Sequence, residues 1–218
     1  MEEISAIYRR RFAGLAKRRE RVWRVLCRFF QRYIPTDATV VEIACGYGEF
    51  INNILVDGRG KKIAIDVNSD AKEHLHDGIT FVNSSAESVE LQDGIADVVF
   101  VSNFFEHLNS SDQLIAVLRR IHLLLRCGGR LIVLQPDIGL VGSKYWDFLD
   151  HKLPITMPRL CEAAAIAGLR PIHLVRRFLP YTMSGKMPVH PFLVSAYLKL
   201  MPISGWFMGK QLLAVFQK

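Results

Sequence analysis

The sequence predicts an α/β fold in which a mainly parallel sheet carries helices on both faces. Three observations lead to this prediction. Short apolar runs of β type alternate with runs of helical spacing along most of the chain. The first of these strand-like runs ends in two glycines one residue apart, Gly46 and Gly48, and apolar residues at helical spacing follow. Half of the 218 residues are apolar and 22% are charged, which is typical of a globular domain with a full core.

The N-terminal segment carries most of the positive charge. Residues 1–40 contain ten Lys or Arg and four Asp or Glu, which accounts for +6 of the total +7. The pattern over 17–33 predicts an amphipathic helix with an aromatic stripe, stopped by Pro35. Its basic face consists of Lys17, Arg21, Arg24, Arg28 and Arg32. We therefore predict an N-terminal basic helical segment at 1–36, whose arginines either lie in solvent or contact nucleic acid or anionic lipid.

The remaining residues, 37–218, form the predicted α/β domain. Its strand-like runs are Thr39–Ile43, Lys62–Asp66, Thr80–Val82, Asp97–Ser102, Arg130–Gln135, Pro171–Val175 and Gln211–Phe216. Helical patterns lie at 49–56, 70–77, 112–126 and 157–167. Gly128 and Gly129 predict a turn before the fifth strand, and Gly168 closes the helix before the sixth. The long connection 179–210 is predicted to cover the substrate, contact a membrane or pack on the domain.

The cysteines and the termini exclude several protein classes. Four cysteines, at 27, 45, 127 and 161, have neither CxxC nor His-paired spacing, so we expect no disulfide framework and no metal site. The start Met-Glu-Glu-Ile does not resemble a secretory signal. No apolar run reaches the ~18 residues of a membrane span. We therefore expect a cytoplasmic protein.

The glycine turn excludes two common nucleotide sites. A dinucleotide site needs a third glycine, but the corresponding residue is Glu49 or Ile51, depending on the register. A carboxylate at a helix start would also repel a pyrophosphate. No Gly-Lys-Ser/Thr follows the turn, so it is not a P-loop. The spacing instead suits an adenosine ligand that has a positive charge and no phosphate.

The motif Glu42-x-Ala44-x-Gly46-x-Gly48 resembles the first motif of the class I S-adenosylmethionine-dependent methyltransferases. In that family the motif is acidic-x-G-x-G-x-G, so Ala44 replaces the first glycine. The family's further landmarks follow in order over residues 37–135. They are Asp66-Val67 after the second strand, Ser85-Ala86 after the third, Asn103 after the fourth, and Leu125–Val133 leading into the fifth.

The resemblance implies a Rossmann-like, seven-stranded, mostly parallel sheet whose last strand is antiparallel, with S-adenosyl-L-methionine as cofactor. Asp66 would hold the ribose, because an ionised carboxylate accepts hydrogen bonds from both hydroxyls. Ser85 stands where an aspartate is common, so the adenine contact would pass to its hydroxyl. The implied cofactor-binding residues are Glu42, Ala44, Gly46, Gly48, Asp66, Val67, Ser85, Ala86 and Asn103.

Candidate acceptor residues follow the fourth and fifth strands. Tyr145, Trp146 and Asp150 combine aromatic faces with a carboxylate, as surfaces that bind sugars or ring compounds do. His107 and His151 are candidate general bases, because the pKa of an imidazole lies near neutrality. For each of these residues a purely structural role is the alternative interpretation.

The predicted function is methylation of an oxygen or nitrogen atom of a small molecule or glycan. A weaker resemblance, to bacterial methyltransferases encoded with surface-polysaccharide or secondary-metabolite genes, agrees with it. One alternative is an RNA or protein methyltransferase that uses the basic helix. The segment 102–105, Ser-Asn-Phe-Phe, differs from the Asn/Asp-Pro-Pro-Tyr-like signature of RNA enzymes that methylate exocyclic amines. The other alternative is a non-catalytic binding module. Peripheral membrane contact and a homodimer are left open.

Overall fold

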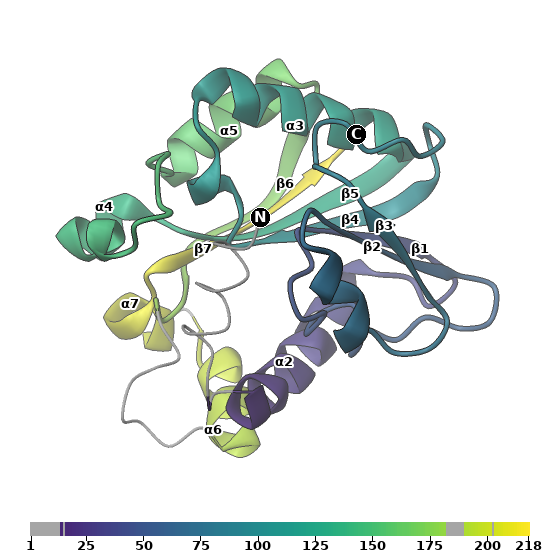
Figure 1. The fold of residues 1–218 in the computed structure, drawn as a ribbon. Helices are drawn as coiled ribbons and strands as arrows, with labels where there is room; N and C mark the ends of the chain where they lie inside the picture. The colour runs from purple at the N-terminus through teal and green to yellow at the C-terminus, as the bar shows by residue number, and fades with distance from the viewer. Residues whose placement is uncertain (1–13, 15, 182–189, 202) are drawn as a thin grey trace.

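The computed structural model describes residue 14 and residues 16–181, 190–201 and 203–218. Its centre is one seven-stranded sheet with the strand order β3-β2-β1-β4-β5-β7-β6 (Figure 1). The strands are β1 (Thr39–Ile43), β2 (Lys61–Asp66), β3 (Ile79–Asn83), β4 (Ala96–Ser102), β5 (Leu125–Pro136), β6 (Arg170–Leu179) and β7 (Gln211–Gln217). All seven strand predictions are confirmed, with ends that move by up to five residues.

The pairing directions confirm the Rossmann-like methyltransferase topology. Strands β1 to β5 pair in parallel, and β7 runs antiparallel between β5 and β6. In the central strand, Val41 lies beside Ile63 of β2 and Val99 of β4. All three side chains are buried, as expected for a sheet covered on both faces.

Helices cover the two faces of the sheet (Figure 1). On one face lie α3 (Ser111–Leu124) and α5 (Met157–Ile166). On the other lie α2 (Ala16–Phe30), α6 (Pro191–Lys199) and α7 (Ile203–Met208). Each layer has its own apolar core against the sheet. No helix in the described ranges is long and apolar enough to cross a membrane.

The helix α2 confirms the amphipathic pattern and packs into the second core. Trp23 and Phe30 meet the ring of Phe100 edge-on, with centroids 6.0 and 5.3 Å away. Phe50, which follows the glycine turn, stacks on Phe100 at 3.6 Å. The short 3-10 helix η1 (Gln31–Tyr33) extends α2 almost to Pro35. The N-terminal helix therefore shares its core with the sheet.

Two helix predictions need correction. Residues 49–53 form turns and 54–56 are irregular, with one α-type bond from Asn52 N to Gly48 O and another from Ile54 N to Phe50 O. The side chains of Asn52 and Asn53 compete by donating to the carbonyls of His74 and Glu49. Instead of a helix at 70–77 there is the 3-10 helix η2 (Ser69–His74), capped by Asn68.

The predicted turn at Gly128-Gly129 is also wrong. Both glycines lie inside β5, which begins directly after α3. The register of β5 against β4 shifts between the pairs of Ala96 and Val98, so the glycines occupy an irregular part of the strand. Gly128 has φ +76°, and a Cβ on Gly129 would lie 2.9 Å from the carbonyl oxygen of Arg126.

The connection after β5 contains α4 (Ile138–Val141) and the 3-10 helix η4 (Gly142–Asp147). The connection between β6 and β7 contains α6 and α7. The division into a segment 1–36 and a domain 37–218 with an insert at 179–210 stays a prediction.

Candidate active site

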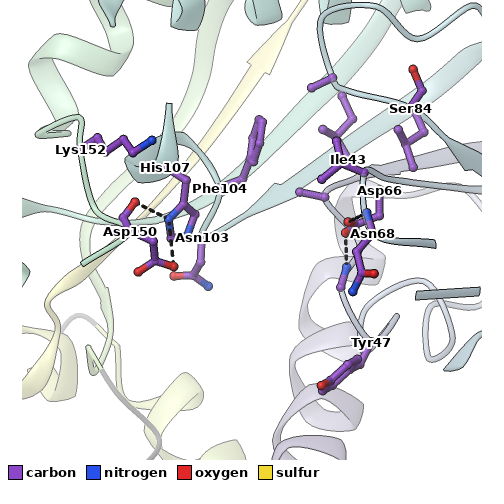
Figure 2. Close-up of a pocket in the computed structure, with 15 residues that line it drawn as sticks. Ile43, Tyr47, Asp66, Asn68, Ser84, Asn103, Phe104, His107, Asp150 and Lys152 are labelled. Atoms are coloured by element: carbon purple, nitrogen blue, oxygen red, sulfur yellow. Dashed lines mark hydrogen bonds and ion pairs between the residues drawn. The ribbon is translucent and has the colours of Figure 1, made fainter. Parts of the chain in front are cut away.

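A cavity of about 290 Å³ lies at the carboxyl ends of β1, β2 and β4 (Figure 2). The strand order reverses between β1 and β4, and ligands of open α/β sheets bind at such a switch point. The lining residues are Ile43, Ala44, Gly46, Tyr47, Ile65, Asp66, Val67, Asn68, Ser84, Ala86, Asn103, Phe104, His107, Asp150 and Lys152. Figure 2 shows two walls, one around Asp66 and one around His107.

The glycine turn forms the base of the first wall. Ala44, Gly46 and Gly48 all have a positive φ, of 54°, 53° and 71°. A Cβ on Gly48 would lie 2.6 Å from the side chain of Leu75, so this position requires glycine for space as well as for φ. Cys45 N donates to Ile65 O and ties the turn to the end of β2. The turn therefore presents its backbone to the cavity at Ala44 and Gly46.

Replacing Ala44 with glycine is expected to raise the free energy of unfolding by up to about 1 kcal/mol. The left-handed conformation costs a residue with a Cβ ~1–2 kcal/mol, whereas glycine adds ~0.4–1 kcal/mol of chain entropy to the unfolded state. Urea denaturation measures the difference. The control is Ala71→Gly, at a buried position of η2, which should lower stability. Equal losses in both variants would contradict the strain at Ala44.

Asp66 is fixed at the end of β2 by the backbone on either side. Its Oδ2 accepts from Gly46 N at 2.8 Å, and its Oδ1 accepts from Asn68 N at 2.9 Å. Burial raises the pKa of this carboxyl, and the two backbone donors oppose that rise. Each carboxylate oxygen has a further lone pair, so Asp66 can still accept from a ligand in the cavity.

Three predicted cofactor residues lie outside the cavity lining. Glu42 is buried and accepts from Ile51 N at 3.0 Å, so it holds the turn that follows Gly48. Burial raises the pKa of Glu42 well above its usual value. Ser85 bonds the hydroxyl of Ser88 at 2.8 Å, and its neighbour Ser84 lines the cavity instead. Gly48 contributes through its conformation.

The second wall begins where β4 ends. Asn103 has φ +48°, and its N–H donates to Leu134 O, which turns the chain sharply into the cavity. His107 follows in the 3-10 helix η3 (Phe105–His107). Its Nδ1 lies 2.9 Å from the backbone oxygen of Asp150 and 3.5 Å from a carboxylate oxygen of the same residue. Both contacts are made by Nδ1 and orient the imidazole. The other ring nitrogen, Nε2, takes part in neither.

The structure separates the other predicted acceptor residues from the cavity. Tyr145 is fully buried and donates to Leu153 O at 2.6 Å, and burial raises the pKa of its phenol. Trp146 is half-exposed and meets Tyr145 edge-on. His151 lies behind His107, with ring centroids 5.2 Å apart. Of the predicted acceptor and catalytic residues, His107 and Asp150 line the cavity; their roles stay predictions.

The cavity also contains residues that the sequence did not single out. Tyr47, Asn68 and Ser84 lie one or two positions from predicted residues. This closeness in sequence was the sign that could have pointed to them. Lys152 and the buried Glu106 likewise adjoin the predicted His151 and His107; Lys152 lines the cavity, whereas Glu106 does not. The backbone N–H groups of Lys152 and Leu153 donate to the Glu106 carbonyl at 2.7 and 3.0 Å, which brings this distant segment to η3.

The lining suits an adenosine group with a positive charge. Apolar side chains share the lining with the carboxylate of Asp66; they are Ile43, Ile65, Val67, Ala86 and Phe104. The charged groups of the lining include two carboxylates, Asp66 and Asp150, and one lysine, Lys152. A flat apolar ring, a diol and a cationic centre would each find a complementary surface here. S-adenosylmethionine contains all three.

Comparisons with known proteins agree with this site. Residues 41–133 match the family model described as a methyltransferase domain. A methyltransferase structure from Thermotoga maritima is 19% identical, with a TM-score of 0.68, covering 97% of this chain and 98% of that chain. One from Archaeoglobus fulgidus is 19% identical, with a TM-score of 0.63, covering 90% and 94%. One from Mesorhizobium loti is 13% identical, with a TM-score of 0.61, covering 88% and 96%.

All three of these structures are described as S-adenosylmethionine-dependent methyltransferases. No curated protein sequence matches the chain. The matched domain spans β1 to β5, which contain the glycine turn, Asp66, Asn103 and His107. The domain match over residues 41–133 and the fold shared with these structures support a class I S-adenosylmethionine-dependent methyltransferase.

Proposed function

We propose that the protein methylates an oxygen or nitrogen atom of a small molecule or glycan. The observation that carries the proposal is the cavity with two unlike walls, Asp66 on one side and the His107–Asp150 pair on the other (Figure 2). The first wall is suited to the cofactor and the second to an acceptor with a proton to lose.

On the cofactor side, Asp66 would accept hydrogen bonds from the ribose hydroxyls. Val67 and Ala86 would flank the adenine, with Ser84 taking the polar contact first expected of Ser85. Ala44 and Gly46 would let the backbone approach the ligand, and Asn103 would face the methionine part. Glu42 and Gly48 would hold the shape of the turn. S-adenosylmethionine supplies a methyl group on a sulfonium, which is already activated for transfer.

On the acceptor side, His107 is the proposed general base. Because Asp150 holds its Nδ1, the imidazole would present Nε2 to an acceptor hydroxyl. As the hydroxyl oxygen forms its bond to the methyl carbon, the carbon–sulfur bond breaks with its electron pair going to sulfur, and His107 takes the hydroxyl proton. A neutral amine acceptor would need no base before the transfer. Most of the acceleration would come from alignment, which can contribute ~7–11 kcal/mol.

Exposed basic residues on α2 support a second candidate, an RNA methyltransferase. Lys17, Arg21, Arg24, Arg28 and Arg32 are all exposed, whereas the opposite face of the helix is in the core. Binding through such a face would weaken steeply as the salt concentration rises. Filter binding of unrelated RNAs at several salt concentrations tests this candidate, and weak or salt-insensitive binding removes it.

The proposal is tested by native mass spectrometry of the freshly purified protein, followed by an acceptor screen with methyl-labelled S-adenosylmethionine. We expect bound S-adenosylmethionine or S-adenosylhomocysteine, and label transfer to a hydroxyl or amine of a sugar or ring compound. Tight cofactor binding with no transfer to any class of acceptor would favour a non-catalytic binding module. Transfer to RNA or protein alone would overturn the proposed acceptor class.

A further inference from the structure

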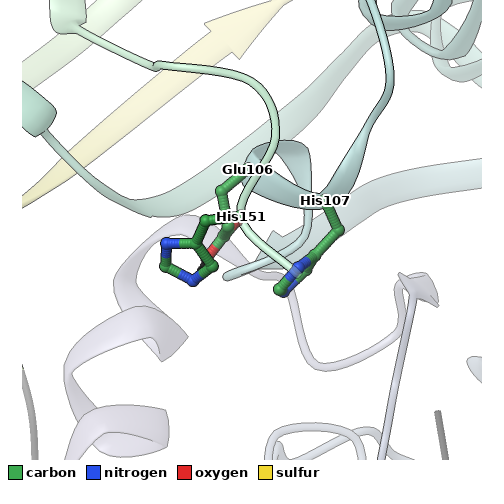
Figure 3. Close-up of side chains that lie close together, drawn as sticks. All are labelled: Glu106, His107 and His151. Atoms are coloured by element: carbon green, nitrogen blue, oxygen red, sulfur yellow. Dashed lines mark ion pairs between the residues drawn. The ribbon is translucent and has the colours of Figure 1, made fainter. Parts of the chain in front are cut away.

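Two histidines and a glutamate meet behind the second wall of the cavity. Glu106, His107 and His151 each offer one ligand atom within 4.8 Å of the others (Figure 3). His151 Nε2 lies 4.0 Å from Glu106 Oε1. Sequence spacing could not show this group, because His151 lies 44 positions after His107 and reaches it through the loop that follows η4.

The two buried members of this group, Glu106 and His151, have few polar partners in the described part of the chain. Glu106 is 1% exposed, and in the described ranges its ion pairs are limited to the 4.0 Å approach of His151. The side chain of His151 is 5% exposed, and its Nδ1 has no hydrogen-bond partner in the described part of the chain. A buried carboxylate is costly unless a positive charge or hydrogen-bond donors compensate it.

Supporting contacts around the group resemble those of metal sites. Gln135 Nε2 donates to Glu106 Oε2 at 2.5 Å and fixes one carboxylate oxygen. Asp150 holds Nδ1 of His107, which leaves Nε2 as the nitrogen available to a ligand. Metal-binding histidines commonly make this contact through the other ring nitrogen.

We propose that Glu106, His107 and His151 bind one divalent transition-metal ion, such as Zn²⁺, at the acceptor side of the cavity. Two imidazoles and one carboxylate suit zinc and its neighbours, whereas Mg²⁺ and Ca²⁺ prefer oxygen ligands. Closed zinc sites space their donor atoms by roughly 3.3 Å, given bonds of ~2.0–2.1 Å. Small side-chain rotations would bring the present donor atoms to that spacing. A position left open by three protein ligands would face the acceptor.

The consequence for the acceptor rests on the proposed function. A hydroxyl bound to such an ion would lose its proton to bulk water more readily, because the positive charge stabilises the alkoxide. In the metal-loaded protein His107 would be a ligand of the ion. The ion would then activate the acceptor hydroxyl in place of His107 as general base. The metal-loaded protein would therefore act on hydroxyl acceptors. The ion would not speed transfer to a neutral amine, which needs no deprotonation beforehand.

Zn²⁺ binding is measured by equilibrium dialysis of the reduced protein, with the metal alone and no acceptor. We expect one saturable Zn²⁺ per chain, and a Kd that rises more than about 10-fold in His107→Gln and in Glu106→Gln. His107→Gln changes a partly exposed side chain, so it tests the site even if the buried Glu106 variant fails to fold. Controls are His76→Ala, an exposed histidine, and Cys127→Ser, an exposed cysteine.

The outcomes separate this inference from the proposed function. Loss of Zn²⁺ binding in the two site variants, with unchanged binding in both controls, supports the site. Equal Zn²⁺ binding by wild type and His107→Gln, or the absence of saturable binding, overturns it. Binding of S-adenosylhomocysteine to the same samples, measured by calorimetry, tests the cofactor side independently.

A second surface stands apart from the cavity. Helices α6 and α7 and the turn between them expose large apolar side chains: Phe192 (72%), Leu193 (48%), Leu200 (60%), Ile203 (67%), Trp206 (68%) and Phe207 (79%). We call these six residues the aromatic surface. Soluble monomers rarely expose so many large apolar groups on neighbouring elements, so such a surface normally has a partner.

The charges near the aromatic surface indicate an anionic partner. The Arg177 guanidinium lies 5.2 Å from the centre of the Trp206 ring, and Lys199 is exposed on α6. Helix α2, with its exposed arginines, packs beside α6 (Figure 1). Aromatic residues next to cations are typical of proteins that sit at an anionic lipid surface.

We infer that the aromatic surface docks on an anionic membrane. The test is co-sedimentation with phosphatidylcholine vesicles, with and without phosphatidylglycerol. We expect binding that requires phosphatidylglycerol, and a loss of at least about 10-fold in Trp206→Ser/Phe207→Ser. The matched control is Leu55→Ser/Leu149→Ser, which removes exposed apolar groups elsewhere and should bind normally. No binding by the wild type, or a dimer in sedimentation velocity that only the Trp206/Phe207 variant dissociates, would overturn the inference.

Discussion

Replacing Asp66 with alanine is expected to raise the Kd for S-adenosylhomocysteine by about 100-fold or more. Two hydrogen bonds from ribose hydroxyls to a carboxylate contribute ~1.5–3 kcal/mol each, and each 1.4 kcal/mol corresponds to tenfold in affinity. Calorimetric titration measures the change. The control is Asp77→Ala, which removes an exposed carboxylate of equal charge just after η2.

The same residue gives the wild-type affinity a characteristic pH dependence. Burial raises the pKa of Asp66, and the ionised form is the better acceptor for the ribose. Affinity should therefore be full above this raised pKa and fall as the pH falls through it, at a higher pH than for an exposed aspartate. The variant also loses the acceptors of Gly46 N and Asn68 N, so its cooperative unfolding must be checked. A folded variant with wild-type affinity would refute the ribose assignment.

Replacing His107 with alanine is expected to lower turnover of a hydroxyl acceptor by about 10²–10⁴-fold, the usual contribution of a general base. Cofactor affinity should change little, because His107 lies on the wall opposite Asp66 (Figure 2). Single-turnover assays with the first acceptor from the screen measure the loss.

Asp150→Ala is the matched comparison for this variant. It removes the carboxylate at 3.5 Å from His107 Nδ1 but keeps the backbone oxygen at 2.9 Å, so the ring retains its main acceptor. We expect a smaller loss of turnover than in His107→Ala. Unchanged turnover in His107→Ala would return the residue to a structural role.

Local hydrophobic patterns predicted most of the fold, because they reflect which side chains are buried. The seven strands and the helices α2, α3 and α5 followed from apolar runs and helical stripes. The predictions failed where side chains compete with the backbone, as at Asn52 and Asn53, and where an irregular strand uses glycines that resemble a turn. Neither cause is visible in a hydrophobic pattern.

The residues of the site also fall into those that the sequence could predict and those that it could not. The first wall lies within a strand or two of the glycine turn, so Ala44, Gly46 and Asp66 could be found from spacing and resemblance. The second wall needs a loop from far along the chain, since Asp150 reaches His107 across 43 positions. The sequence offered His107 and Asp150 as candidates but could not show that they meet. Lys152 and Glu106 adjoin His151 and His107 in the sequence, but the contact between their two segments also depends on this loop.

The packing of α2 also has a consequence for synthesis of the chain. Phe29 and Phe30 lie 5.1 and 6.0 Å from the ring of Phe178, which is made 148 positions after Phe30. At ~5–20 residues per second, roughly 7–30 s pass before the ribosome adds this partner. Until β6 emerges, the aromatic stripe of α2 has no complete surface to cover it. The aromatic side chains of α2 are therefore exposed to water for most of the time in which the chain is being made.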